Sequence, residues 1–139
     1  LAQFIHYGTI STEVLGKGER AGVLNSYKAV FNKFPETIEE WKDTIKIANG
    51  RWPRKRNLEA EEEIQNSEFK KIYKRDPDMD NPNDNAAVTI MTYGLRPVKR
   101  NLESEENGLK IFRAIYNYNP EEVADWEIVR AIAYSGATR

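Results

Sequence analysis

Apolar side chains recur along the chain with the period of an α-helix. Tyr27, Val30 and Phe31 stand at i, i+3 and i+4, a spacing that places side chains on one face of a helix. The same spacing returns as Phe69, Ile72, Tyr73 and again as Phe112, Ile115, Tyr116. These groups are followed by Pro35, Pro77 and Pro120. Because a proline disfavours the helical conformation of the residue before it, each group predicts a helix that ends ahead of its proline.

A second helix is predicted between each of these prolines and a later glycine. In the first case Thr37 and Glu40 have the spacing of a capping box, a signal that starts a helix. The expected inner-face residues are Trp41, Ile45 and Ala48 in the first case and Trp126, Val129 and Ala133 in the third. The helices should end at Gly50, Gly94 and Gly136, and an earlier glycine, Gly8, has a similar context. We expect positive φ at Gly50 and Gly94, because a left-handed residue closes a helix and only glycine adopts it without a Cβ penalty.

These patterns predict an all-α fold. The expected helices span 20–33, 37–49, 58–74, 83–93, 104–117 and 121–135. Asn57 and Asn101 are expected to be N-caps of the helices that follow them. Phe31, Tyr73 and Tyr116 are expected to occupy equivalent buried positions, since they stand at the same place in each pattern.

The chain also repeats itself. The segments Pro53–Glu62 and Pro97–Glu106 agree at eight of ten positions with an offset of 44. The repeat predicts tandem two-helix units of about 43 residues, a period in the range of HEAT-like and armadillo-like repeats. We expect a partial unit at 1–18 and full units at 19–56, 57–100 and 101–139, stacked as a short helical array or a compact helical domain.

Composition narrows the possible functions. The 139 residues include 21 Lys and Arg against 22 Asp and Glu, so no net positive charge favours nucleic acid. The chain has no cysteine, which excludes disulfides, thiolate catalysis and Cys-ligated zinc. A single histidine, His6, cannot form a multi-histidine metal site within one chain, and we interpret it as a helix-end residue. No apolar run is long enough to cross a bilayer, and no cofactor is predicted.

Two basic linkers contain the candidate binding residues. They are Trp52, Arg54, Lys55 and Arg56 in the first linker and Arg96, Lys99 and Arg100 in the second. Stacked units would place both linkers on one edge, where cations bind phosphate or another acidic polymer. Acidic residues follow each linker directly, so local charge balance is the alternative interpretation. Trp52 and Tyr118 fall outside the predicted helices and are candidates for stacking on a sugar or a partner, whereas the other aromatics are expected in the core.

An acidic turn lies between two predicted helices. Asp76, Asp78 and Asp80 have the alternate spacing of an EF-hand loop. The match fails at the sixth position, Asn81 instead of Gly, and at the twelfth, Ala87 instead of Glu. The turn is therefore predicted to cap the next helix and not to bind calcium, with a calcium site as the open alternative.

Two segments carry a resemblance to a known class of protein. Ile45–Pro53 and Val129–Gly136 are similar to tandem helical repeats of uncharacterised secreted or surface-displayed bacterial proteins. This resemblance implies an extracellular or cell-surface module without catalytic residues. The chain begins without Met, and we expect further copies or domains in a longer parent protein.

The sequence thus favours a non-enzymatic structural or interaction module that binds a protein or a cell-wall polymer, without nucleic acid and without membrane insertion. The alternative is a small enzyme that acts on glycans with a pair of carboxylates, since carboxylates are the only reactive groups present in number. We expect equivalent units to carry equivalent surfaces if the role is structural, and one unit to differ if it holds a catalytic site.

Overall fold

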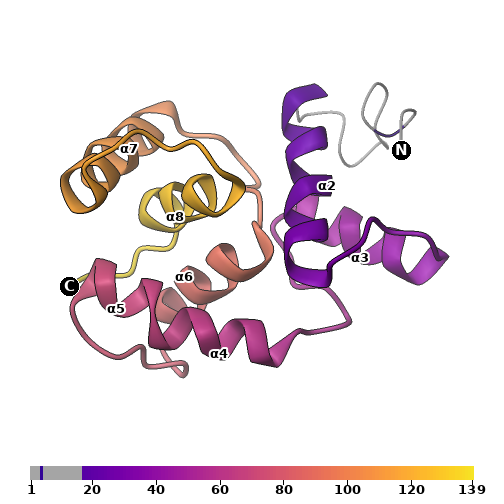
Figure 1. The fold of residues 1–139 in the computed structure, drawn as a ribbon, viewed down its shortest axis with the longest axis horizontal. Coiled ribbons are helices and arrows are strands. Elements are labelled where there is room, and N and C mark those ends of the chain that lie inside the picture. Colours follow the sequence, from indigo (N-terminus) through magenta and orange to yellow (C-terminus); the bar gives the residue numbers. More distant parts are fainter. Residues whose placement is uncertain (1–3, 5–16) are drawn as a thin grey trace.

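The computed structural model describes Phe4 and residues 17–139, and these residues form helices without any β-strand (Figure 1). The helices are α2 (Lys17–Phe31), α3 (Ile38–Ala48), α4 (Leu58–Asn66), α5 (Glu68–Tyr73), α6 (Pro82–Tyr93), α7 (Leu102–Tyr116) and α8 (Val123–Tyr134). The prediction of an all-α fold is confirmed, with boundaries close to the expected ranges. Gly8, His6 and most of the expected partial unit lie outside the described residues.

Helices α6 and α8 form the centre of the molecule. They pack extensively on one another, and α8 also packs along α7. Helix α4 lies against α6, while α2 packs on α3 and touches both α6 and α8. In Figure 1 the α2–α3 pair therefore stands at one end, α7 at the other, and α4 and α5 run below the centre.

The helix starts follow the predicted capping residues. Thr37 accepts a hydrogen bond from the Glu40 amide while the Glu40 carboxylate accepts one from the Thr37 amide, which completes the capping box. Asn57 and Asn101 cap α4 and α7 through their side chains. Asn81 caps α6 in the same way. Each cap satisfies amides that have no partner inside the helix.

The helix predicted over 58–74 is interrupted. Ser67 has φ −123° and ψ −87°, so it separates α4 from α5. Its hydroxyl donates to the Glu63 carbonyl four residues earlier, at 2.6 Å. A serine hydroxyl competes in this way for helix backbone groups, which explains why periodicity alone did not reveal the break.

Left-handed residues end most of the helices. Gly50, Gly94 and Gly136 have φ of 76°, 69° and 78°, which confirms the prediction made for the first two. The other positive-φ residues among those described are Asn32, Lys74 and Asn117. They follow the ends of α2, α5 and α7 at intervals of 42 and 43 residues, which is the spacing of the sequence repeat. Asparagine at such a position is common, whereas a lysine with φ of 61° is unusual.

The core is built on three aromatic pairs, which lie near the ends of α2, α5 and α7. Tyr27, Phe69 and Phe112 are almost fully buried. Each is 4.6–4.7 Å, between ring centroids, from the aromatic residue four positions later, Phe31, Tyr73 or Tyr116. The prediction that these later residues are all buried holds for Tyr73 and is wrong for Phe31 and Tyr116, which are partly exposed. The helices turn the earlier member of each pair inward, so the later one lies at the edge of the core.

One polar arrangement occurs twice. Arg56 binds Glu61 at 2.6 Å, the Tyr93 hydroxyl donates a hydrogen bond to Glu61, and the Tyr93 oxygen accepts one from the Asn57 amide. The second copy consists of Arg100, Glu105, Tyr134 and Asn101. The first copy joins the start of α4 to the end of α6, and the second joins the start of α7 to the end of α8.

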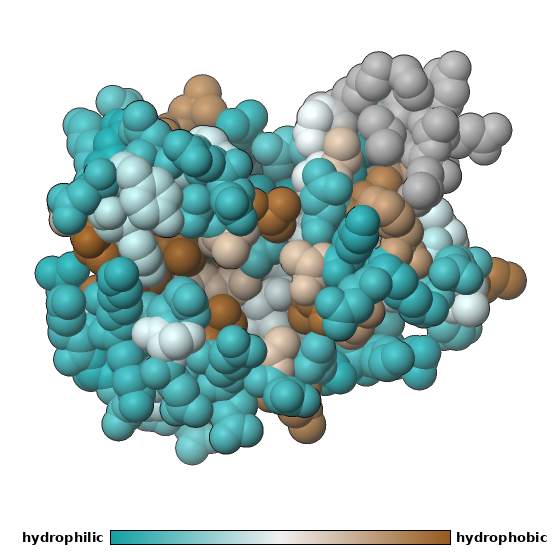
Figure 2. All heavy atoms as spheres, in the orientation of Figure 1, coloured by the Kyte–Doolittle hydropathy of each residue, from teal (hydrophilic) through white to brown (hydrophobic). Residues whose placement is uncertain are grey.

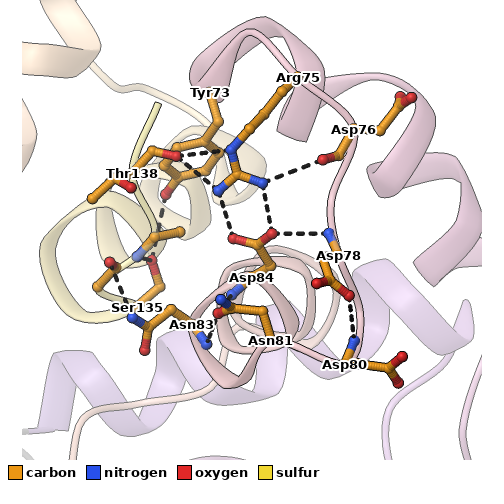
Figure 3. Close-up of polar contacts among 12 residues, drawn as sticks. Tyr73, Arg75, Asp76, Asp78, Asp80, Asn81, Asn83, Asp84, Ser135 and Thr138 are labelled. Carbon is orange, nitrogen blue, oxygen red and sulfur yellow. Dashed lines mark hydrogen bonds and ion pairs between the residues drawn. The ribbon is translucent and has the colours of Figure 1, made fainter.

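The acidic turn uses its carboxylates to hold its own shape. Arg75 forms two hydrogen bonds with Asp84, at 2.6 and 2.7 Å, and its guanidinium also donates to the Thr138 carbonyl (Figure 3). Asp84 accepts the Asp78 amide, and Asp78 accepts the Asp80 amide. The turn is thereby fixed between α5, α6 and the segment after α8. The prediction that it binds no calcium stays a prediction.

Gly94→Ala should lower the free energy of unfolding by about 1–3 kcal/mol, because φ is positive and a Cβ would lie 2.5 Å from Ser26 Oγ. The matched control is Gly18→Ala, where a Cβ meets nothing within 4 Å and alanine favours the helix. Urea denaturation of both variants measures the difference. Equal stability of the Gly94 variant and the parent protein would contradict the assigned role of this helix end.

Phe69→Ala should cost about 3–5 kcal/mol, since the ring is fully buried. Phe31→Ala should cost clearly less, because that ring is partly exposed at the edge of the core. Chemical denaturation of the two variants compares the same deletion at two depths. A larger loss for Phe31 than for Phe69 would show that the core has been misplaced.

Candidate functional site

A large cavity lies between α2 and α8. We refer to it as the α2–α8 cleft; its volume is about 720 Å³. Residues 95–101, which join α6 to α7 and are called the linker, and one side of α7 complete its walls. On the face of the molecule drawn in Figure 2, apolar residues gather in the middle, between two largely hydrophilic surfaces. A concave site between elements that are distant in sequence is the usual place for a ligand.

Arg96 anchors the linker to α2. Its side chain is 1% exposed and its Nε lies 3.0 Å from a carboxylate oxygen of Glu19. Its Nη1 donates to the Gly94 carbonyl at 2.7 Å, and its Nη2 would lie 2.6 Å from a Cβ at Gly22. Glycine at position 22 is therefore what allows the guanidinium to lie against α2. Desolvation, with repulsion from Arg130 as the next cause, lowers the pKa of Arg96 to about 9, so the group keeps its charge at neutral pH.

A partly buried arginine, Arg130, and a buried glutamate, Glu127, extend from α8. Burial lowers the pKa of Arg130, while the carboxylates of Glu19 and Glu127 act in the opposite direction. Burial also raises the pKa of Glu127 to about 8, although the Ser26 hydroxyl and the two arginines partly offset it. Glu127 is 5% exposed. At neutral pH it is therefore mostly protonated, so its negative charge does not offset the repulsion between Arg96 and Arg130.

Several buried polar atoms around the cleft have no hydrogen-bond partner within the described residues: Ser26 Oγ, Arg96 Nε, Glu127 Oε1 and Arg130 Nη1. Arg96 Nε still has its ion pair with Glu19, which lies close but at an angle unsuited to a hydrogen bond. Ser26 and Glu127 lie beside the same point of Gly94, yet they too lack hydrogen-bond geometry. Native proteins leave few such groups unpaired, so their concentration in one place marks this cleft as a functional candidate.

The mouth of the cleft combines positive charge with apolar surface. Lys99 is exposed, and Arg100 is exposed but paired with Glu105 at 2.9 Å. Val98 is 86% exposed, and Trp126 is 42% exposed. The expectation that Trp126 belongs to the core is wrong. It is on the solvent side of α8, because the inner side of that helix is occupied by Ile128, Val129 and Ala131.

The structure places the predicted binding residues in two cavities and, for the rest of the first linker, in contacts within the protein. Arg96, Lys99 and Arg100 line the α2–α8 cleft, although Arg96 is buried. Trp52 lines a second cavity, of about 500 Å³, to which Arg96 and Asn85 also contribute.

The two arginines of the first linker pair with acidic side chains of the protein, whereas Lys55 is bound through its backbone amide. Arg54 pairs with Glu39 at 3.5 Å, and the amides of Arg54 and Lys55 donate to Asp43. Arg56 pairs with Glu61 and lies 4.5 Å from the Trp52 ring centroid. Local charge balance thus describes Arg54, Arg56 and Arg100, whereas Trp52 is 49% exposed and Tyr118 46% exposed, outside the core as expected.

Sequence reasoning missed Ser26, Glu127, Arg130 and Trp126 as site residues. One signal was present: Glu127 and Arg130 stand at i and i+3 on the helix that also carries Ile128 and Val129, so charges interrupt an apolar pattern. The pairing of α8 with α2, more than 90 residues away, has no signal in the sequence.

Among residues 17–139 no group of three or more His, Cys, Asp or Glu side chains is placed to hold a metal ion. Within that same range, none of the helices is both long and apolar enough to cross a bilayer. Comparisons with protein-family models, with curated proteins and with solved structures give no significant match.

Glu127→Gln should alter how stability depends on pH. The carboxyl pKa is about 8 in the folded state and near 4.5 when unfolded, so its contribution is greatest below pH 4.5 and is lost as pH rises to about 8. The glutamine variant lacks this loss. Its stability relative to the parent protein should rise between pH 5 and 8, by at most about 1.4 kcal/mol per pH unit. Urea denaturation at pH 5, 7 and 9 measures it; parallel profiles for the two proteins would contradict the buried, neutral state of Glu127.

Proposed function

We propose that this chain is a non-catalytic repeat module that binds an acidic segment of a protein or of a cell-surface polymer in the α2–α8 cleft. The observation that carries the proposal is the cleft itself, with Lys99 and Trp126 exposed at its mouth and two arginines below them. Cations supply attraction for an acidic chain, and an exposed indole supplies a surface for apolar or planar groups.

We further propose that the architecture is a tandem arrangement of two-helix units of about 43 residues. Three recurring features support it. Left-handed residues return at intervals of 42 and 43, and an aromatic pair lies near the end of each of α2, α5 and α7. The hydrogen-bonded group of Arg, Glu, Tyr and Asn occurs twice. Such units stack readily in longer chains. The similarity of two segments to repeats of bacterial surface proteins supports an extracytoplasmic parent protein with further copies.

The alternative, a carboxylate enzyme acting on glycans, has one observation in its favour. A buried carboxyl with a raised pKa, such as Glu127, is what a general acid requires. Glu127, the carboxyl with the raised pKa, does not line the cleft. Of the three acids that do, Glu19 is paired with Arg96 and Glu105 with Arg100, and the third is Glu121. A general acid must reach the bond that it protonates, so the binding function is favoured.

The proposal is tested by titrating the protein with poly-L-glutamate and with polygalacturonate, using neutral dextran as the uncharged polymer. Lys99→Glu should weaken binding of at least one polyanion about tenfold at low salt, because it places a negative charge at the mouth of the cleft. The matched control is Lys110→Glu, the same charge change on an exposed position of α7 outside the cleft. Rising salt should weaken the interaction in the parent protein.

Isothermal calorimetry gives the dissociation constants. Failure of both polyanions to bind, or equal losses for Lys99→Glu and Lys110→Glu, would reject the cleft as the binding surface. Hydrolysis of polygalacturonate that is lost in Glu127→Gln would favour the enzymatic alternative.

A further inference from the structure

The floor of the α2–α8 cleft holds two buried polar atoms without a hydrogen bond of ordinary geometry in the described chain. Ser26, from α2, is fully buried, and its hydroxyl lies beside the Glu127 carboxyl, whose pKa it lowers, without forming such a bond. Arg130, from α8, has a buried Nη1 without a partner. Both residues line the cleft. A hydroxyl and a guanidinium nitrogen that line the same cleft from two helices are donors of the kind that recognise an anionic oxygen.

The charges around this floor leave one cation uncompensated. Glu19 balances Arg96 from α2, and Glu105 of α7 balances Arg100 of the linker. Tyr134 is neutral at physiological pH, since burial raises its pKa further. Burial also keeps Glu127 mostly protonated. Arg130 is then the cation without an ion pair of its own: Glu19 and Glu105 attract it, but Glu19 is paired with Arg96 and Glu105 with Arg100, and Arg96 repels it. A single negative charge at this position would complete the balance.

The walls above the floor select the kind of anion. They are formed by Pro97, Val98, Leu109, Val123, Trp126 and Val129. Aliphatic side chains gain from contact with other apolar groups and give nothing to a polyphosphate or to a hydrated sugar ring. A polypeptide offers what both parts of the cleft require, because it can carry a carboxylate next to an aliphatic side chain.

We infer that the floor of the α2–α8 cleft is a binding site for one carboxylate of a polypeptide segment, held by Arg130 and Ser26. An aliphatic residue beside that carboxylate packs against Leu109 and Val123. This inference rests on the proposed binding function and specifies its ligand. Because the two donors come from α2 and α8, the bound carboxylate also links α2, at one end of the molecule, to the central helix α8 (Figure 1).

The test is a titration of the whole chain with acetyl-Leu-Glu-Leu-amide, followed by NMR through the Trp126 indole N–H, which is assigned with Trp126→Phe. The matched probe is acetyl-Leu-Gln-Leu-amide, and inorganic phosphate is the third. The glutamate peptide should bind about tenfold or more tightly than the other two probes, because only it combines the charge with the aliphatic groups. Arg130→Gln should abolish this preference, and Ser26→Ala should weaken it severalfold.

The matched control for these variants is Arg113→Gln, an exposed arginine of α7 that contacts Asn119 and is outside the cleft. Its affinity should equal that of the parent protein. Circular dichroism checks the fold of each variant, and Ser26→Ala decides the question if Arg130→Gln does not fold. Binding should also weaken as pH rises past about 8, where Glu127 gains its charge.

Several outcomes would overturn the inference. Equal affinity for the glutamate and glutamine peptides would show that the site does not recognise a carboxylate. Tighter binding of phosphate than of the glutamate peptide would show that the ligand is not a polypeptide. If both Arg130→Gln and Ser26→Ala keep the preference for the glutamate peptide, Arg130 and Ser26 are not the groups that hold the carboxylate. If polyanions still bind in a manner that depends on Lys99, this inference fails while the proposed function stands; if neither peptides nor polyanions bind, both fail.

Discussion

The buried guanidinium of Arg96 is the contact on which the arrangement of the two ends depends. Its side chain reaches α2 through Glu19 and Gly22, while its backbone amide donates to the Ile47 carbonyl at the end of α3. One linker residue therefore joins the α2–α3 pair to the rest of the molecule. Burying the Arg96 charge costs desolvation energy. The ion pair with Glu19 and the hydrogen bond to the Gly94 carbonyl offset that cost.

Glycines make this contact possible. A Cβ at Gly22 would meet the Arg96 guanidinium at 2.6 Å, and a Cβ at Gly50 would meet the Arg96 carbonyl oxygen at 2.5 Å. The two glycines belong to α2 and to the end of α3, so the linker is held closely on both sides. The cleft is a consequence: fixing α2 against the linker leaves α8 facing α2 across a space that side chains fill incompletely.

Local structure followed from the sequence because its causes are local. Thr37, Asn57 and Gly94 interact with backbone groups only a few residues away, so the sequence alone was enough to predict that they cap helices. The site was less accessible to prediction. Arg96 was read as a surface cation from its basic neighbours, whereas its burial depends on Gly22, 74 positions earlier. Trp126 was assigned to the core by helical spacing, which fixes a shared face but not which face turns inward.

The contacts of the segment after α8 bear on the order in which the chain can fold. Arg75 donates to the Thr138 carbonyl, 63 residues further along, and Arg139 donates to the Ile72 carbonyl, 67 residues back. During synthesis, the loop between α5 and α6 emerges long before these partners do. Its pairing with Asp84 is local and can form at once, but its connection to the end of α8 must wait until those last residues have left the ribosome. The α4–α6 region is therefore completed late, by residues that lie beyond the helices it packs against.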